Sequence, residues 1–116
     1  MHSNELHKSM IKQDSNHSIA IVGAGAMGSG IAQVAAQAGH SVILFDTSEQ
    51  ALDRSQNQLA QVAHRQVSKG RWTQLESDAL QVRISRTSKI NEVIGCDLII
   101  EAIVEDFDAK TSLFQK

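Results

Sequence analysis

The sequence of this protein is poor in cysteine, in net charge and in long apolar runs. Cys96 is its only cysteine, so no internal disulfide can form, and we expect a reducing, cytoplasmic location. The formal net charge of −2 shows no basic excess, which argues against nucleic acid and anionic membranes as partners. No apolar run approaches the ~18 residues that a membrane-spanning helix needs, so we expect no membrane partner either.

The amino-terminal residues form a polar leader that differs from the rest of the chain. Residues 1–17 are rich in His, Ser, Asn, Gln and Lys and carry no apolar periodicity, so we expect them to be disordered. They lack the apolar core of a secretory signal peptide, and their histidines are irregularly spaced, so we expect no metal site there. Residues 18–116 are then expected to form one domain.

A short apolar segment followed by a glycine-rich loop is the feature around which the chain is organised. Residues 19–22 predict a buried strand, and Gly23, Gly25 and Gly28 follow it in the spacing G-x-G-x-x-G. Apolar residues then recur at helical spacing and predict the buried face of a helix: Met27, Ile31, Val34, Ala35 and Ala38. Such a strand, loop and helix let the backbone approach a pyrophosphate, and the helix start favours an anion.

An acidic residue ends the next predicted strand. Residues 42–45 are apolar without alternation, which is typical of a strand covered on both faces, and Asp46 follows them. Asp46 lies 18 residues after Gly28, close to the ~20 residues expected for the carboxylate that binds a ribose. The loop and Asp46 together predict a dinucleotide site that prefers NAD to its 2′-phosphorylated form.

A helical hairpin is predicted between the second and third strands. Residues 47–50 and 73–76 have the pattern of capping boxes, which open helices. The first helix is expected to run to about Lys69 and the second through Leu80. We expect Trp72, at the tip of the hairpin, to pack between the two helices.

The alternation of strands and helices sets the fold class. Residues 82–87 and 96–104 predict the third and fourth strands, with a short helical turn over 89–94. The expected fold is α/β, a Rossmann-type doubly wound parallel sheet with strand order 3-2-1-4 and the hairpin inserted after the second strand. A last helix is predicted to begin near Glu105 and is cut short. We therefore expect a truncated sequence, with the C-terminal part and a substrate and dimerisation domain absent.

The glycine loop and the fourth strand resemble those of the N-terminal NAD-binding domain of the 3-hydroxyacyl-CoA dehydrogenase family. The resemblance rests on residues 23–33 (GAGAMGSGIAQ), Asp46, the long hairpin and residues 97–106 (DLIIEAIVED), and it covers 18–116. The Met-Gly-x-Gly-Ile-Ala-Gln extension makes it more specific than the glycines alone. The family oxidises L-3-hydroxyacyl-CoA to 3-oxoacyl-CoA and passes the hydride to NAD.

The resemblance also implies roles for individual residues. Loop residues would line the pyrophosphate, Asp46 would hold the adenine ribose, and a pair after the fourth strand would contact the cofactor. The implied cofactor-binding residues are Gly23, Gly25, Ala26, Met27, Gly28, Gly30, Asp46, Glu105 and Lys110. Lys69 would contact the phosphates of an acyl-CoA, which the absent regions also bind, and the full-length protein would be a homodimer.

The catalytic residues of the family have no counterpart in this sequence. Its histidine, the glutamate that activates it, and the serine and asparagine that position the substrate all come later in such enzymes. We therefore expect cofactor binding without catalysis from these residues. Two alternatives stay open: a 3-hydroxyisobutyrate dehydrogenase-type oxidoreductase, which Asp46 and the long hairpin disfavour, and a non-catalytic NAD-sensing regulatory module. A His–Glu pair encoded past Lys116 would decide for the dehydrogenase.

Overall fold

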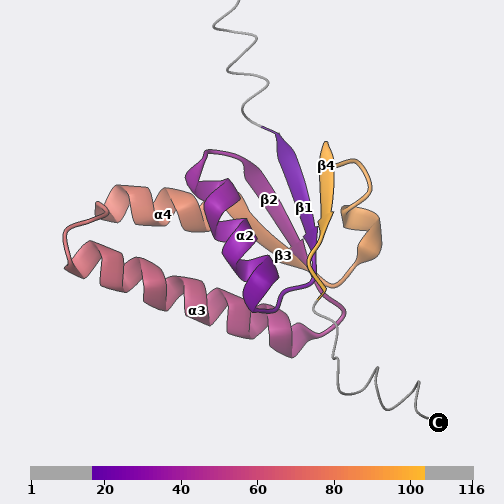
Figure 1. Ribbon diagram of the computed structural model, residues 1–116, viewed down its shortest axis with the longest axis horizontal. Coiled ribbons are helices and arrows are strands. Elements are labelled where there is room, and N and C mark those ends of the chain that lie inside the picture. The colour runs from indigo at the N-terminus through magenta and orange to yellow at the C-terminus, as the bar shows by residue number, and fades with distance from the viewer. Residues whose placement is uncertain (1–16, 104–116) are drawn as a thin grey trace, which may run out of the picture.

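A parallel four-stranded sheet forms the centre of the protein, whose computed structural model describes residues 17–103 (Figure 1). Its strands are β1 (Ser18–Val22), β2 (Ser41–Phe45), β3 (Ile84–Thr87) and β4 (Leu98–Glu101). They are ordered β3-β2-β1-β4, and each neighbouring pair is parallel. The predicted Rossmann-type fold class and strand order are therefore confirmed.

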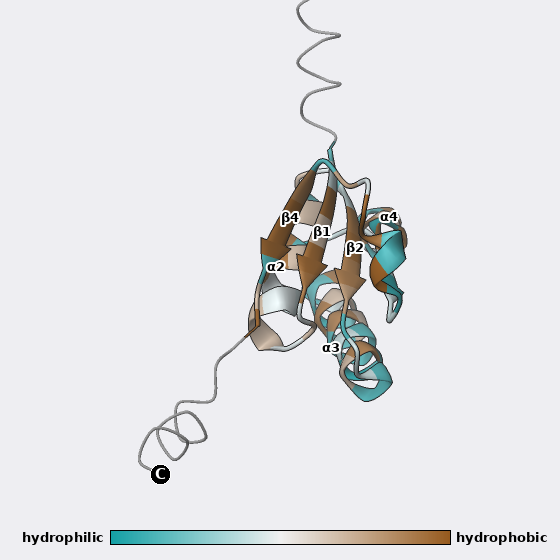
Figure 2. Cartoon of the chain, turned by 90° about the vertical axis from the view of Figure 1, so that its right-hand side faces the viewer, coloured by the Kyte–Doolittle hydropathy of each residue, from teal (hydrophilic) through white to brown (hydrophobic). Residues whose placement is uncertain are grey.

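Within the described part of the chain, three helices cover one face of this sheet. They are α2 (Ala26–Gln37), α3 (Glu49–Ser68) and α4 (Gln74–Arg83), and Figure 1 shows α3 and α4 as a hairpin beside α2. The strands turn alternate side chains toward these helices, among them Ile21 and Leu44, which are fully buried. In Figure 2 the strands are strongly hydrophobic, whereas much of α3 and α4 is hydrophilic. None of the helices within residues 17–103 is long and apolar enough to cross a membrane.

The other side chains of the same strands form a smaller cluster on the opposite face. Ala20 and Phe45 pack there against Val93, which directly follows the 3-10 helix η1 (Ile90–Glu92) between β3 and β4. Cys96 is partly buried against this cluster, as expected of a small apolar side chain. The helical turn predicted before the fourth strand is this 3-10 helix.

Small residues, rather than the larger apolar ones, form the buried face of α2. Gly28, Ala32 and Ala36 are buried, whereas Met27 is 53% exposed and Val34 is 66% exposed. The prediction that Met27, Val34 and Ala38 belong to the buried face is wrong, whereas Ile31 and Ala35 do pack partly buried against the core. The helix lies so close to β1 that only small side chains fit between them, because protein interiors leave no room for overlap.

The helical hairpin lies where it was predicted, but one of its capping residues differs. Thr73 and Glu76 form the predicted capping box, with the Oγ1 of Thr73 accepting the N–H of Glu76 at 3.0 Å. At the start of α3, Ser48 is the N-cap residue, so the prediction of Thr47 is wrong. The Oδ1 of Asp46 accepts the N–H of Ser48 at 2.9 Å, and this bond fixes the turn so that Ser48 precedes the helix.

The second helix of the hairpin is longer than predicted, and the strand after it is shorter. Helix α4 continues past Leu80 to Arg83, so β3 begins at Ile84 rather than at Val82. The Nη1 of Arg83 donates a hydrogen bond to the carbonyl oxygen of Ala36 at 2.8 Å. The same carbonyl oxygen accepts the backbone N–H of Gly39 at 3.0 Å, so the bond from Arg83 is a second one and joins the end of α4 to the end of α2.

Polar contacts join the amino-terminal ends of the strands. The N–H of His17 donates to the Nδ1 of His40 at 3.0 Å, and the two rings are stacked with centroids 5.9 Å apart. The Oδ2 of Asp97 accepts the N–H of Ser18 at 2.9 Å, and this bond is the main cause that lowers the pKa of Asp97. Of the leader predicted for residues 1–17, only His17 is among the described residues. Its contacts with His40 hold it at the amino-terminal ends of the strands.

Candidate dinucleotide-binding site

A cavity of about 410 Å³ lies at the carboxyl ends of the strands. Parallel strands bring these ends to one edge of the sheet, so the loops that follow them gather there. The lining residues come from these loops and the first turns of α3: Val22, Gly23, Gly25, Phe45, Asp46, Thr47, Ala51, Arg54, Ala102 and Ile103. The two motifs singled out in the sequence, the glycine loop and Asp46, thus line the same cavity.

The glycine loop is shaped by backbone contacts that exclude a side chain at two of its positions. Gly23 has a φ angle of +114°, and a Cβ atom there would lie 2.9 Å from the carbonyl oxygen of Ala102. A Cβ atom on Gly28 would lie 1.7 Å from the carbonyl oxygen of Gly23. A Cβ atom on Gly25, by contrast, would meet nothing within 4 Å. Gly25 therefore leaves open space beside the backbone, which fits the close approach of a pyrophosphate.

The start of α2 provides hydrogen-bond donors beside this open space. Gly25 is the N-cap residue, and no side chain caps the helix. The first N–H groups of a helix lack partners within it, and the helix dipole places a partial positive charge there. No acidic residue occupies the first turn of α2 to compete for them. The arrangement fits a bound anion such as a pyrophosphate.

The carboxylate of Asp46 is held in place by two backbone groups. Its Oδ2 accepts the N–H of Ala24 at 2.9 Å, and its Oδ1 accepts the N–H of Ser48 at 2.9 Å. Each carboxylate oxygen has a further acceptor position, so the group can still accept hydrogen bonds from the hydroxyls of a ribose. A fixed carboxylate at this position fits NAD and disfavours a 2′-phosphate.

Arg54 is a lining residue that the sequence analysis missed. It lies in the second turn of α3, three residues after Ala51, and both residues line the cavity together with Asp46. Residues three apart lie on the same face of a helix. Once the start of α3 places Ala51 beside the cavity, the same face therefore includes Arg54. A guanidinium there can stack on an adenine ring or bind a phosphate.

The other predicted cofactor residues lie outside this cavity or outside the described residues. Ala26 and Gly30 line a smaller crevice of about 190 Å³ between α2 and α3. Met27, next to them on α2, is largely exposed. Glu105 and Lys110 fall outside residues 17–103. The cofactor roles of these residues stay predictions.

Lys69 and the described histidines lie away from the Asp46 cavity. Lys69 is the exposed C-cap residue of α3 at the tip of the hairpin, so its predicted CoA contact stays a prediction. His17 and His40 meet at the amino-terminal ends of the strands, and His64 is exposed on α3. Among residues 17–103, no three His, Cys, Asp or Glu side chains gather as a metal site would require.

Comparisons with known proteins point to one family. Residues 18–116 match the family described as 3-hydroxyacyl-CoA dehydrogenase, NAD binding domain. The chain is 37% identical over 101 residues to a 3-hydroxybutyryl-CoA dehydrogenase of Mycobacterium tuberculosis, a match that covers 87% of this chain and 35% of that protein. It is 35% identical over 96 residues to the 3-hydroxyadipyl-CoA dehydrogenase of Escherichia coli, with 83% of this chain and 20% of that protein covered. The crystal structure of (S)-3-hydroxybutyryl-CoA dehydrogenase from Ralstonia eutropha superposes with a TM-score of 0.75 at 31% identity, covering 86% of this chain and 35% of that one.

The matched region is the one that contains the site. The chain spans about a third of the length of the Mycobacterium tuberculosis relative. The matching family domain binds NAD, and the open backbone at Gly25 and the fixed carboxylate of Asp46 fit this cofactor. The chain therefore belongs to the 3-hydroxyacyl-CoA dehydrogenase family, whose NAD-binding domain it carries.

Proposed function

We propose that the protein takes part in the oxidation of an L-3-hydroxyacyl-CoA to a 3-oxoacyl-CoA, and that this chain supplies the part that binds NAD. The observation that carries the proposal is the cavity in which Asp46 and the open backbone at Gly25 lie together. Family membership supports the reaction, since matched relatives are named 3-hydroxybutyryl-CoA and 3-hydroxyadipyl-CoA dehydrogenases.

Each part of the cavity has a role in this proposal. Bound NAD supplies the chemistry by accepting a hydride from the carbon that carries the substrate hydroxyl. The loop from Gly23 to Gly30, including Ala26 and Met27, lies along the pyrophosphate, and the first N–H groups of α2 bind its charge. Asp46 accepts hydrogen bonds from the ribose hydroxyls. Glu105 and Lys110 contact the cofactor beyond β4.

The substrate would be bound by the hairpin and by further parts of a longer protein. Lys69, at the tip of the hairpin, is suited to a CoA phosphate because its ammonium is a compact positive charge. We further propose short-chain or fatty-acid-derived acyl groups, a homodimer of the full-length protein, and a cytoplasmic location. The names of the relatives support the acyl groups, the family resemblance supports the homodimer, and the single cysteine supports the cytoplasmic location.

The general base would lie outside the described residues. Oxidation of a secondary alcohol needs a group that takes the hydroxyl proton, and histidine is suited to this near neutral pH. The described histidines occupy the opposite end of the sheet or the exposed surface of α3. Such a base contributes about 10²–10⁴-fold to the rate, so its loss leaves a chain that binds cofactor without turnover.

The experiment is a spectrophotometric assay of NADH formation from NAD and 3-hydroxybutyryl-CoA. It compares this 116-residue chain with the longer product of its gene. We expect turnover only from the longer protein, although both bind NADH. Turnover by the 116-residue chain would show that the base lies within it. NADH binding without turnover by the longer protein would favour the NAD-sensing module.

A further inference from the structure

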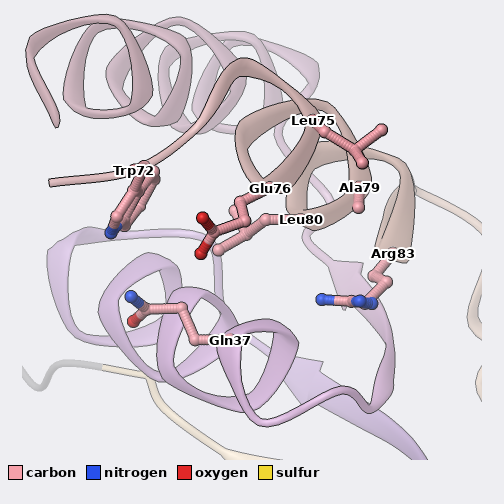
Figure 3. A pocket seen from close by; sticks show the side chains of 7 residues that line it. All are labelled: Gln37, Trp72, Leu75, Glu76, Ala79, Leu80 and Arg83. Carbon is pink, nitrogen blue, oxygen red and sulfur yellow. The ribbon is translucent and has the colours of Figure 1, made fainter. Parts of the chain in front are cut away.

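A second groove lies between the C-terminus of α2 and helix α4, and its lining shares no residue with the Asp46 cavity. Its volume is about 400 Å³, within the range of sites that hold small molecules. Figure 3 shows its lining side chains, which come from α4, the tip of the hairpin and the end of α2: Gln37, Trp72, Leu75, Glu76, Ala79, Leu80 and Arg83. The NAD site makes no use of these residues.

The groove combines apolar side chains with a guanidinium group at one end. Trp72 forms one wall and the buried Leu80 lies behind it, so a flat or aliphatic group can pack there. Trp72, which we expected to pack between the two hairpin helices, is partly buried against the main core and also lines the groove, facing the end of α2. Figure 3 shows the guanidinium of Arg83 at the far end of the groove from Trp72, and the amide of Gln37 turned toward Trp72 and away from Arg83.

The two charged residues of the groove are separated along α4. Glu76 lies in the first turn of α4, and its Oε1 accepts the N–H of Thr73 at 3.2 Å in the capping box. Arg83 is seven residues later, about two turns of helix away. One of its nitrogen atoms, Nη1, binds the carbonyl oxygen of Ala36, and a guanidinium has further N–H groups. An anionic ligand would therefore place its charge at the Arg83 end, away from Glu76.

We propose that this groove is a second binding site, for a small apolar carboxylate. The ring or chain of the ligand packs on Trp72 and Leu80, and its carboxylate accepts hydrogen bonds from Arg83. The hydrophobic interior provides affinity for the apolar part, and the guanidinium selects the carboxylate over a neutral group. The site is independent of NAD binding at Asp46.

The composition of the chain offers a direct test of this site. Trp72 is the only tryptophan and there is no tyrosine, so the intrinsic fluorescence of the chain reports on this groove alone. The unaltered chain is titrated with phenylacetate and, separately, with phenylacetamide, which has the same shape without the charge. We expect saturable binding of phenylacetate with a Kd of about 0.1–1 mM, and binding of the amide at least ~10-fold weaker.

Two charge-removing variants complete the test. Arg83→Gln should weaken phenylacetate binding by ~10-fold or more and leave the amide unaffected. Arg65→Gln removes an exposed positive charge from α3 outside the groove and should change neither. Circular dichroism and calorimetric NADH binding show that each variant is folded, and they report on the NAD site separately.

Three results would overturn the proposal. The first is a fluorescence change that does not saturate up to about 20 mM phenylacetate, a concentration twenty times the highest Kd expected. The second is equal affinity for the acid and the amide. The third is unchanged phenylacetate binding in Arg83→Gln. The comparison of acid with amide needs no variant, so the proposal stays open to disproof even if Arg83→Gln fails to fold.

Discussion

The carboxylate of Asp46 at the end of β2 accepts a hydrogen bond from the backbone N–H of Ala24, within the glycine loop that follows β1, at 2.9 Å. Its second oxygen accepts the N–H of Ser48, the residue that caps α3. One carboxylate thus joins the glycine loop after β1 to the start of the hairpin, beside the cavity that Asp46 lines.

A substitution at Gly25 should impair cofactor binding without impairing folding. A Cβ atom at Gly25 would meet nothing within 4 Å, so Gly25→Val should leave the sheet assembled. Its side chain would occupy the space that the pyrophosphate needs, and we expect NADH affinity to fall by ~100-fold or more. Circular dichroism checks the fold and titration calorimetry the affinity. Retained NADH binding would mean that the phosphates lie elsewhere.

Gly28 is the matched position at which folding itself should fail. A Cβ atom there would lie 1.7 Å from the carbonyl oxygen of Gly23, a backbone atom that cannot move aside as a side chain could. We expect Gly28→Ala to lower the free energy of unfolding by at least about 2 kcal/mol, through overpacking between α2 and β1. Urea denaturation measures this. A variant as stable as the unaltered chain would contradict the close contact between α2 and the loop.

Asp97 should make the stability of the chain depend on pH in the acid range. The backbone hydrogen bond from Ser18, with a smaller contribution from His17, lowers the pKa of Asp97 in the folded state. A carboxyl group with a lowered pKa contributes stability above its unfolded pKa, near 4, and this contribution is lost as the pH falls through the folded value.

The variant Asp97→Asn tests this dependence. It keeps an oxygen that can accept the N–H of Ser18 but removes the titrating charge. We expect it to be less stable than the unaltered chain at about pH 7 and to lose less stability between about pH 5 and pH 3. Midpoints of urea denaturation at each pH measure both effects. Parallel pH profiles for the two chains would contradict the role of Asp97.

The sequence predicted those parts of the protein that depend on local patterns. The G-x-G-x-x-G loop and Asp46 stand next to two apolar strands, and parallel topology brings the ends of such strands together. This is why the strand order and the shared position of Gly25 and Asp46 could be expected. The capping box of Thr73 and Glu76 was equally local and is present in the structure.

The features that were missed depend on contacts between distant segments. Met27 and Val34 are more hydrophobic than Gly28 and Ala32, yet the close approach of α2 to β1 buries the small residues. Thr47 and Ser48 can both cap a helix, and the hydrogen bond from Ser48 to Asp46 decides between them. Whether Arg54 faces the cavity depends on the residue at which α3 begins. The sequence pattern predicted Thr47 as the N-cap of this helix, whereas the N-cap is Ser48.

Asp46 is expected to set the choice of cofactor. A 2′-phosphate would place its negative charge beside a carboxylate that is already fixed by Ala24 and Ser48, and like charges in contact cost several kcal/mol. Asp46→Asn should reduce this discrimination by ~10-fold or more, because the repulsion is removed while Arg54 remains available to a phosphate. Lys69→Gln, at the tip of the hairpin, should leave it unchanged.

The most direct test of the account is a calorimetric titration of the 116-residue chain with NADH and with NADPH at the same ionic strength. The geometry of Asp46 and the glycine loop predicts that NADH binds at least ~100-fold more tightly than NADPH. Equal affinities for the two cofactors, or no binding of NADH by the folded chain, would contradict the assignment of this cavity as the NAD site.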